Sequence, residues 1–279
     1  MQQAHRTAQL LTTDESEQER LLRAVARYVA DTPPGDLSPA EYTTPIYRIL
    51  AELSGVRDAY AETRDRQNRT ALALLPHIEA AVRAHADPLT AAARVAAAGN
   101  LIDSGVGVPE DVERSLLAAI DQPFVRDESP RFFAQLRDNA RSLLYICDNA
   151  GEIVFDRLFI QILKEHFPRL RVTAAVKGTP ILNDATVDDA RQSGLDRAAD
   201  ALITTGEGVV GVPLGRVSAE FRRALEQSDL FLSKGQGNYE TLDEQPGGFL
   251  ILAAKCQVVA EELGAREGDL VFVASRKAE

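Results

Sequence analysis

The sequence has few of the side chains that form disulfides or bind zinc. Only two cysteines, Cys147 and Cys256, occur in 279 residues, which excludes a framework of disulfides and a zinc site made of thiolates. The four histidines do not cluster in any spacing typical of metal ligands. Any metal ion bound to this chain must therefore be held mainly by oxygen atoms.

Long apolar runs and basic patches are also missing. No segment approaches the roughly 20 apolar residues that a membrane-spanning helix needs, and residues 1–20 lack the apolar centre of a signal peptide. The net charge of −11 and the pI of about 5.0 disfavour a broad attraction to nucleic acid or to an anionic membrane. We therefore expect a cytoplasmic protein that binds neither, and the sequence does not indicate its oligomeric state.

What the chain does contain is a helical first half. The overall composition, 45% hydrophobic and 26% charged, is typical of a globular protein long enough for one large domain or two ordinary ones. Up to about residue 140, apolar residues recur at helical spacing, as in ERLLRAVARYVA and ALALLPHIEAAV. This pattern predicts a helical bundle domain over residues 1–140.

The second half, residues 141–279, has a different pattern. Short β-rich runs alternate with helical segments, an order typical of right-handed β-α-β crossovers and a mostly parallel sheet. The predicted strands are LLYIC, RVTAAV, ALITT, LFLS, FLILAA and LVFVAS. The fold class is therefore predicted as α/β, with an N-terminal helical bundle domain followed by a Rossmann-like domain whose sheet is flanked by helices.

Polar residues and glycines follow four consecutive predicted strands. Loops at the carboxyl ends of parallel strands converge at one edge of a sheet, where ligands bind in open α/β folds. The loops contain Asp148, Asn149, Gly151 and Glu152 after the first strand, Lys177, Gly178, Asn183 and Asp184 after the second, Gly206 after the third, and Lys234, Gly235, Gln236, Gly237 and Asn238 after the fourth. Their joint placement predicts a binding site at this edge.

The chemistry of these loops fits a divalent cation together with a phosphate group. Asp148 and Asp184 supply anionic oxygens, and Asn149 adds a neutral oxygen, a set suited to Mg²⁺, Mn²⁺ or a similar ion. Lys177 and Lys234 would contact phosphate oxygens. Glycines 235 and 237 would let backbone N–H groups approach the phosphate, and Gly151 precedes a helix whose N-terminus faces the same place. Metal-assisted hydrolysis of a phosphate ester needs this inventory.

Each of these features also has a simpler interpretation. Asp148 and Asn149 fit an ordinary turn or cap, and Asn183 with Asp184 fits a helix start. The lysines fit solvated loop ends, and Cys147 fits a small buried side chain. The segment AGNLID, with Asn100 and Asp103, fits the end of a helix. The convergence of four loops, and no single residue, favours a site.

Several known phosphate-binding motifs are excluded. GQGNYE lacks the third glycine of a dinucleotide fingerprint and comes late in the chain, and no Gly-Lys-Ser/Thr loop is present. A phosphoaspartate mechanism of the haloacid dehalogenase type needs an acid two residues after the nucleophile, but Ala150 occupies that position relative to Asp148. Asp148 is therefore interpreted as a metal ligand.

The segments AGNLID, CDNAGE, KGTPILNDAT and SKGQGNYE, in this order, resemble the damage-control phosphatase family, formerly domain of unknown function 89. The resemblance covers most of the chain. It implies a divalent-metal-dependent phosphatase (Mn, Co, Ni or Mg) acting on phosphate monoesters of small, often damaged or side-product metabolites, such as sugar phosphates or phosphorylated cofactor fragments. By this resemblance, Asp148, Asn149 and Asp184 are the metal ligands.

The resemblance also implies where the substrate binds. The candidate phosphate and substrate contacts are Lys177, Gly178, Asn183, Lys234, Gly235, Gln236, Gly237, Asn100 and Asp103, with Glu152 as a proton acceptor or an orienting residue. Many similar microbial chains have a Cys-x-x-Cys pair in the helical half, which is absent here. Two other functions stay open: a non-catalytic protein that binds a phosphorylated metabolite, and a Rossmann-like methyltransferase, although CDNAGE has only one glycine.

Overall fold

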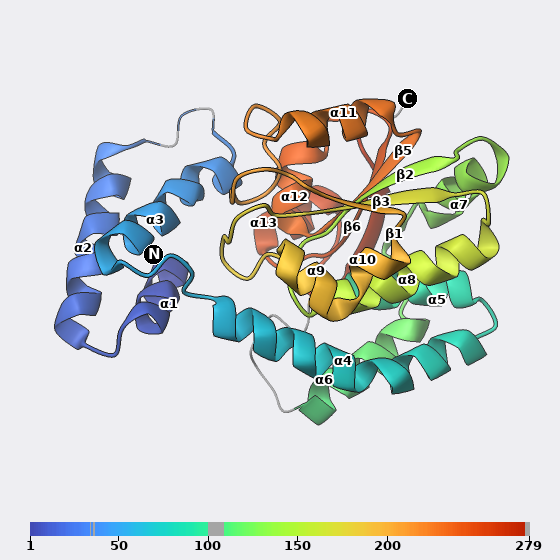
Figure 1. Cartoon of the computed structure of the whole chain (residues 1–279), viewed down its shortest axis with the longest axis horizontal. Coiled ribbons are helices and arrows are strands. Elements are labelled where there is room, and N and C mark those ends of the chain that lie inside the picture. The colour runs from blue at the N-terminus through green and yellow to red at the C-terminus, as the bar shows by residue number, and fades with distance from the viewer. Residues whose placement is uncertain (34, 36, 100–108, 277–279) are drawn as a thin grey trace.

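A seven-stranded sheet lies at the centre of the larger part of the molecule (Figure 1). The structure is a computed structural model that describes residues 1–33, 35, 37–99 and 109–276. The strands are β1 (Arg126–Asp127), β2 (Ser142–Ile146), β3 (Arg171–Val176), β4 (Ala201–Thr204), β5 (Leu230–Lys234), β6 (Gly248–Ala253) and β7 (Leu270–Ala274). Their order is β1-β7-β6-β5-β2-β3-β4, and only the β6–β7 pair is antiparallel among these neighbours. The predicted α/β fold with a mostly parallel sheet is confirmed.

Helices make up most of the rest of the described chain. Those before β2 are α1 (Gln2–Leu11), α2 (Glu15–Asp31), α3 (Pro39–Ser54), α4 (Ala61–Ala84), α5 (Pro88–Ala98), α6 (Pro109–Asp121) and α7 (Ser129–Asp138). Those after β2 are α8 (Glu152–His166), α9 (Val187–Ser193), α10 (Leu195–Ala198), α11 (Ala219–Gln227), α12 (Gln236–Leu242) and α13 (Gln257–Leu263). Within the described ranges, none of these helices is long and apolar enough to cross a bilayer.

Each face of the sheet is covered by helices. In β2, Leu143 and Tyr145 belong to a hydrophobic cluster shared with α4 to α8, whereas Leu144 and Ile146 belong to a second cluster shared with α11 to α13. Figure 1 shows α11 above the strands and α4, α5 and α6 below them. A parallel strand covered on both faces buries nearly every side chain, which explains why the strands appear in the sequence as almost continuous apolar runs.

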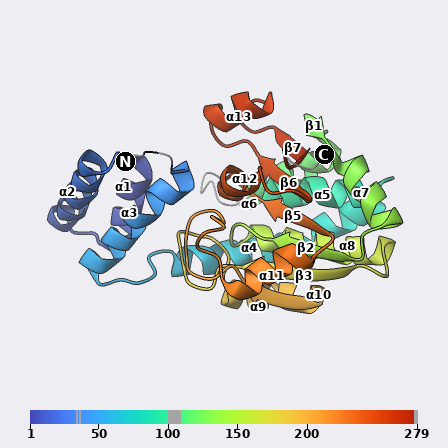
Figure 2. The same ribbon diagram turned by 90° about the horizontal axis from the view of Figure 1, so that it is seen from above.

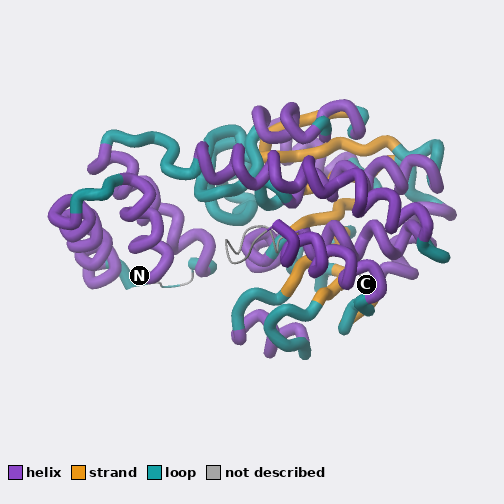
Figure 3. The backbone as a smooth tube through the Cα atoms, turned by 90° about the horizontal axis from the view of Figure 1, so that it is seen from below, coloured by secondary structure: helices purple, strands orange, loops and turns teal. Residues whose placement is uncertain are grey.

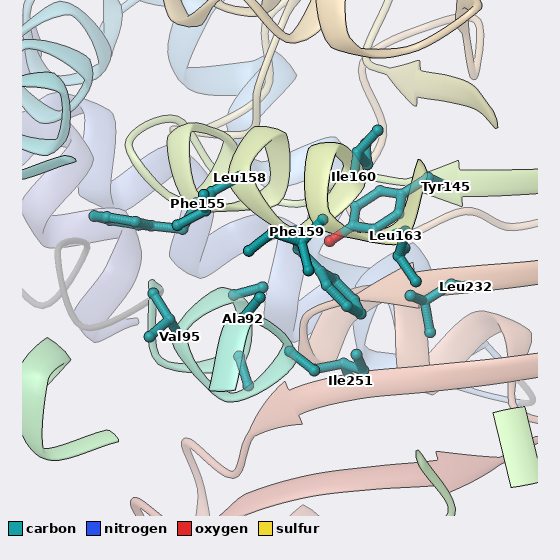
Figure 4. Close-up of a cluster of buried hydrophobic side chains, with 14 of the residues drawn as sticks. Ala92, Val95, Tyr145, Phe155, Leu158, Phe159, Ile160, Leu163, Leu232 and Ile251 are labelled. Carbon is teal, nitrogen blue, oxygen red and sulfur yellow. The ribbon is translucent and has the colours of Figure 1, made fainter. Parts of the chain in front are cut away.

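Small side chains let α5 lie close to α8. Ala92 and Val95 of α5 are buried beside Phe155 and Phe159 of α8, in the cluster drawn in Figure 4. At Gly99, directly after α5, an added Cβ would lie 3.2 Å from the Phe155 side chain. The alanine-rich sequence of α5 therefore sets the spacing between the helical half and the helix that follows β2.

Helices α1 to α3 have a hydrophobic core of their own. It contains Ala4, Ala8, Leu21, Val25, Ile46 and Leu50. Figures 2 and 3 show these three helices beside the rest of the molecule, at the side from which the loops of the sheet protrude.

The main core crosses the predicted domain boundary. It extends from Ala71 to Phe272 and combines α4 to α7 with the sheet. In addition, β1 pairs with β7, although it belongs to the half for which the sequence predicts helices alone. Two residues between helices carry no periodicity, so the sequence could not reveal this strand. The boundary at residue 140 stays a prediction.

Candidate functional site

The candidate site lies at the point of the sheet where the order of the strands reverses. The strand β2 lies between β3 and β5, so the crossovers on its two sides diverge and leave a crevice at the carboxyl ends of the strands. Asp148 follows β2 and Gly235 follows β5. Gly235 has a φ of +81°, and a Cβ there would lie 1.9 Å from Asp148 Oδ2. Glycine is therefore required for both the backbone conformation and the room that the Asp148 carboxylate occupies.

Backbone hydrogen bonds bring the loops after β2 and β3 together. The N–H of Ala185 donates to the Asp148 carbonyl over 2.8 Å, and the N–H of Ala150 donates to the Asn183 carbonyl over 2.9 Å. Asn149 and Asp184 face each other as an antiparallel bridge between these bonds. The three residues that the sequence predicts as metal ligands thus come together from two loops.

The carboxylates at this point repel one another. Burial raises the pKa of Asp148 well above its ordinary value, and the negative charges of Glu152 and Asp184 raise it further. The Asn149 amide donates to Asp148 Oδ2 over 2.7 Å and faces Glu152 Oε2 at 3.5 Å. Such concentrated negative charge, built from hard oxygen atoms, fits a divalent cation.

The set of candidate ligands is two carboxylates and one amide. Among the described residues, no three His, Cys, Asp or Glu side chains meet in a geometry that would hold a metal ion. Asn149 is therefore essential to the predicted set, because its side-chain oxygen would be the third ligand from the protein.

Lys177 lies beside the candidate ligands. Its ammonium is buried, donates to the Gly211 carbonyl over 2.5 Å and lies 3.4 Å from Asp184 Oδ2. Gly211 belongs to the loop between β4 and α11, which crosses the same edge of the sheet. Lys177 thus places a positive charge beside the ligand set, and its contact with a phosphate group stays a prediction.

Lys234 lies deeper than the sequence suggests. Its ammonium is fully buried and donates to the Ala96 carbonyl at 2.8 Å, to Glu152 Oε1 at 2.7 Å and to Asp156 Oδ1 at 2.7 Å. An ammonium has three N–H donors, and all three are used within the protein. Lys234 therefore has no N–H donor left for the predicted contact with a phosphate group. One of these three bonds would have to break before the contact could form.

The carboxylate of Asp156 completes this buried network. It accepts a 2.6 Å hydrogen bond from the hydroxyl of Tyr145, which Figure 4 shows pointing from β2 toward α8. Burial raises the pKa of Asp156 to about 6, although Lys234 opposes the shift. Burial lowers the pKa of Lys234, but Asp156 and Glu152 outweigh it, so that pKa is raised overall. Lys234 is thus a cation placed between two anions directly behind the site.

Three other residues predicted to contact the substrate, Gly178, Asn183 and Gln236, differ in how close they lie to the candidate ligands. Gly178 lies so near the loop after β4 that an added Cβ would be 2.3 Å from the Gly206 carbonyl oxygen. Asn183 is buried and faces Gln67 Oε1 at 3.5 Å. Gln236 opens α12, and its side-chain amide donates to Glu240 and to Cys256 Sγ, away from Asp148.

Three further predictions concern Gly237, the segment AGNLID and Cys147. An added Cβ at Gly237 would make only ordinary contacts. Asn100 and Asp103 lie outside the described residues. Cys147 is buried in the main core, and burial raises the pKa of its thiol well above the ordinary value, which disfavours a nucleophilic role.

The sequence analysis missed a set of polar residues on α4. Arg64, Gln67 and Asn68 are buried and contact the loops of the site. The sequence does contain a pattern that indicates their burial, because their spacing continues the apolar stripe of the same helix toward its N-terminus. That stripe comprises Ala71, Leu75, Ile78 and Val82.

A cavity of about 580 Å³ lies between α1, α3 and the loop after β3. Tyr47, Leu50 and Tyr60 line it on one side, and residues 179–182 line it on the other. The latter segment leads directly to Asn183. Burial, Tyr60 and the charge of Asp184 all raise the pKa of Tyr47, which puts the cavity within electrostatic reach of the ligand set.

Comparison with known proteins agrees with this geometry. The family model for the damage-control phosphatase ARMT1-like domain matches residues 1–271. The chain is 36% identical over 270 residues to the damage-control phosphatase of Archaeoglobus fulgidus. This alignment covers 95% of this chain and 92% of that protein. It is 33% identical over 277 residues to the damage-control phosphatase PH1575 of Pyrococcus horikoshii, with coverage of 98% and 94%.

The fold is shared as well. The crystal structure of the Pyrococcus horikoshii protein PH1575, described as a DUF89 family protein, superposes with a TM-score of 0.90 and 33% sequence identity over 99% of this chain and 95% of that chain. The match extends along almost the whole length of both proteins. The chain therefore belongs to the damage-control phosphatase family.

Proposed function

We propose that the protein is a divalent-metal-dependent phosphatase that hydrolyses phosphate monoesters of small metabolites, including damaged or side-product ones. The observation that carries the proposal is the pairing of the loops after β2 and β3, which brings together Asp148, Asn149 and Asp184. The names of the relatives in Archaeoglobus fulgidus and Pyrococcus horikoshii support the phosphatase class. Sugar phosphates and phosphorylated cofactor fragments are the proposed substrates, and Mn²⁺, Co²⁺, Ni²⁺ or Mg²⁺ the proposed ions.

Asp148, Asn149 and Asp184 would hold the ion at the edge of the sheet. A divalent ion in such a site supplies positive charge for the phosphoryl oxygens and lowers the pKa of a water molecule. Lys177, beside Asp184, would donate to a phosphoryl oxygen. Glu152, which bonds to Lys234 and faces the Asn149 amide, would orient that amide or accept a proton.

The cavity beside α3 would receive the organic part of the substrate. Residues 179–182 line this cavity and continue into Asn183 and Asp184, so a bound ester would have its phosphoryl group at the ligand set and its body beside Tyr47. The cavity has both apolar walls and tyrosine hydroxyl groups, which suits a small organic molecule with a few polar groups.

The test is phosphate release from a panel of esters with each metal ion added to protein treated with EDTA. We expect no release without metal and restored release with at least one of the four ions. Full activity after exhaustive chelation would contradict the proposal. Metal and ester binding without turnover would instead support the non-catalytic alternative. Ile181→Trp, which fills the cavity, should raise KM much more than it lowers kcat, and an unchanged KM would place the substrate body elsewhere.

A further inference from the structure

The buried stripe of α4 changes from apolar to polar where it reaches the site. Arg64 and Gln67 are 6% exposed and Asn68 is 0% exposed, and the stripe continues as apolar residues from Ala71 onward. A buried polar group costs free energy unless it has hydrogen-bond partners. The partners of these side chains therefore indicate what they stabilise.

Asn68 joins the two loops that carry the candidate ligands. Its Oδ1 accepts a 2.7 Å hydrogen bond from the N–H of Gly151, two residues after Asn149. Its Nδ2 donates to Asp189 Oδ1 over 2.8 Å and to Gln192 Oε1 over 2.7 Å. Both of its N–H donors and its carbonyl are thus used, and the two loops meet on one fully buried side chain.

Asp189 connects Asn68 to the loop that contains Asp184. Its Oδ2 accepts hydrogen bonds from the backbone N–H and the hydroxyl of Thr186, at 2.9 and 2.6 Å, which cap the start of α9. Thr186 is two residues after Asp184. A displacement of Asp189 would therefore be transmitted to Asp184 through a short, hydrogen-bonded segment.

Arg64 contacts the same loop on the other side of Asp184. Its Nε donates to Asp189 Oδ2 over 3.1 Å and its Nη1 donates to the Leu182 carbonyl over 3.3 Å. Leu182 has a φ of +48°, in the left-handed region that leucine rarely adopts. The contact with Arg64 helps to stabilise this conformation, which directs the chain from the cavity wall to Asp184.

We propose that Asn68 is a positioning residue for the metal site, which fixes the spacing between the loop of Asp148 and Asn149 and the loop of Asp184. The inference rests on the proposed function, because it needs a metal ion to bind these residues. Without Asn68, ion binding would have to supply the free energy that brings the two loops into register, and affinity would fall.

The test compares Asn68→Ala with Gln192→Ala by calorimetric titration of EDTA-treated protein with Mn²⁺. Gln192 is an exposed partner of Asn68, and its removal leaves the bonds of Asn68 to Gly151 and Asp189 in place. We expect Asn68→Ala to bind Mn²⁺ roughly 10- to 100-fold more weakly, as is typical when a group that orients metal ligands is removed. Gln192→Ala should bind like the wild type.

A second readout separates positioning from a general loss of stability. The visible absorption spectrum of bound Co²⁺ reports ligand number and geometry, so it should change in Asn68→Ala and stay unchanged in Gln192→Ala. Thermal unfolding in EDTA would show how much stability each variant loses without metal. If Asn68→Ala does not fold, Asn68→Ser serves for the same two measurements, and weaker binding with a changed spectrum is again expected.

Two outcomes would overturn the inference, in distinguishable ways. A folded Asn68 variant with wild-type Mn²⁺ affinity and Co²⁺ spectrum would overturn it alone and leave the metal site standing. A wild-type protein that binds none of the metal ions would overturn the proposed function and this inference with it.

Discussion

The pKa of an aspartate is shifted in opposite directions at the two ends of the neighbouring strands β2 and β5. At the amino end, Asp229 accepts hydrogen bonds from the backbone N–H groups of Arg141 and Ser142 and from the Ser142 hydroxyl, at 2.8 to 2.9 Å. These bonds lower the pKa of Asp229. At the carboxyl end, Asp148 is half-buried, and desolvation together with the negative charges of Glu152 and Asp184 raises its pKa.

The difference is between a carboxylate whose charge is compensated by hydrogen-bond donors and one that lies among charges of the same sign. The negative charge of Asp229 is compensated by donors from the same chain, so it stabilises the junction between the two strands. The charge of Asp148 is concentrated with others of the same sign, an arrangement that costs stability and is typical of functional sites. The contrast can be tested at both ends, beginning with the largest expected effect.

Lys234 is the residue whose removal should cost the most stability. In Lys234→Met, Glu152 and Asp156 lose their common cation in a buried place, so we expect the free energy of unfolding to fall by about 3–5 kcal/mol. Urea denaturation of the metal-free protein measures this. Lys164→Met is the matched control, because Lys164 pairs with Asp200 at 2.9 Å but both side chains are about one third exposed, and its effect should stay below about 1 kcal/mol. A stable Lys234→Met protein with a large loss of kcat/KM would favour direct contact with phosphate.

Gly235 and Gly247 compare the two ends of the sheet at nearly the same φ. Gly235→Ala would place a Cβ against Asp148 Oδ2 at the carboxyl end and displace that carboxylate, and a misplacement of about 1 Å costs roughly 100-fold in rate. Gly247 has a φ of +79° at the amino end of β6, with no atom within 4 Å of an added Cβ. Gly247→Ala should therefore cost only about 1–2 kcal/mol of stability. Equal losses of phosphatase activity would refute the special role of Gly235.

Asp148→Asn and Asp229→Asn should change the stability of the metal-free protein in opposite directions. The lowered pKa of Asp229 means that its contribution is present above pH 3.8 and disappears as the pH falls below that value, so Asp229→Asn should cost about 1 kcal/mol or less at pH 7 and nothing in strong acid. The raised pKa of Asp148 means that stability is lost as the pH rises above 3.8, so Asp148→Asn should be more stable than the wild type at pH 7 in EDTA. Thermal unfolding between pH 3 and pH 8 measures both signs.

The sequence predicted the parts of the site that come directly after strands of the sheet. The strand that precedes Asp148 was visible as a buried apolar run, and the rule that parallel strands expose their carboxyl ends on one edge brought Asp184 and Gly235 to the same region. That rule also predicted the general place of Lys177. Each of these inferences uses only local patterns and the topology of the sheet.

What the sequence could not show depends on contacts between distant elements. The sequence predicted Lys234 directly after its strand, whereas Lys234 is the last residue of β5. Its burial depends on Asp156 and the Ala96 carbonyl, which come from α8 and α5. Asn68 is 83 residues away from Gly151 along the chain. A contact at such a separation depends on how α4 packs on α8. The periodicity of a single helix does not show which helix it packs against.

The separate hydrophobic core of α1 to α3 bears on how this protein could diversify. Among the described residues, its core residues are all distinct from those of the main cluster that supports the loops of Asp148 and Asp184. Mutations inside the three helices can therefore accumulate and reshape one wall of the cavity while the ligand loops keep their support. Exchanging these helices between relatives would then change one wall of the cavity while the residues of the candidate ligand set stay the same.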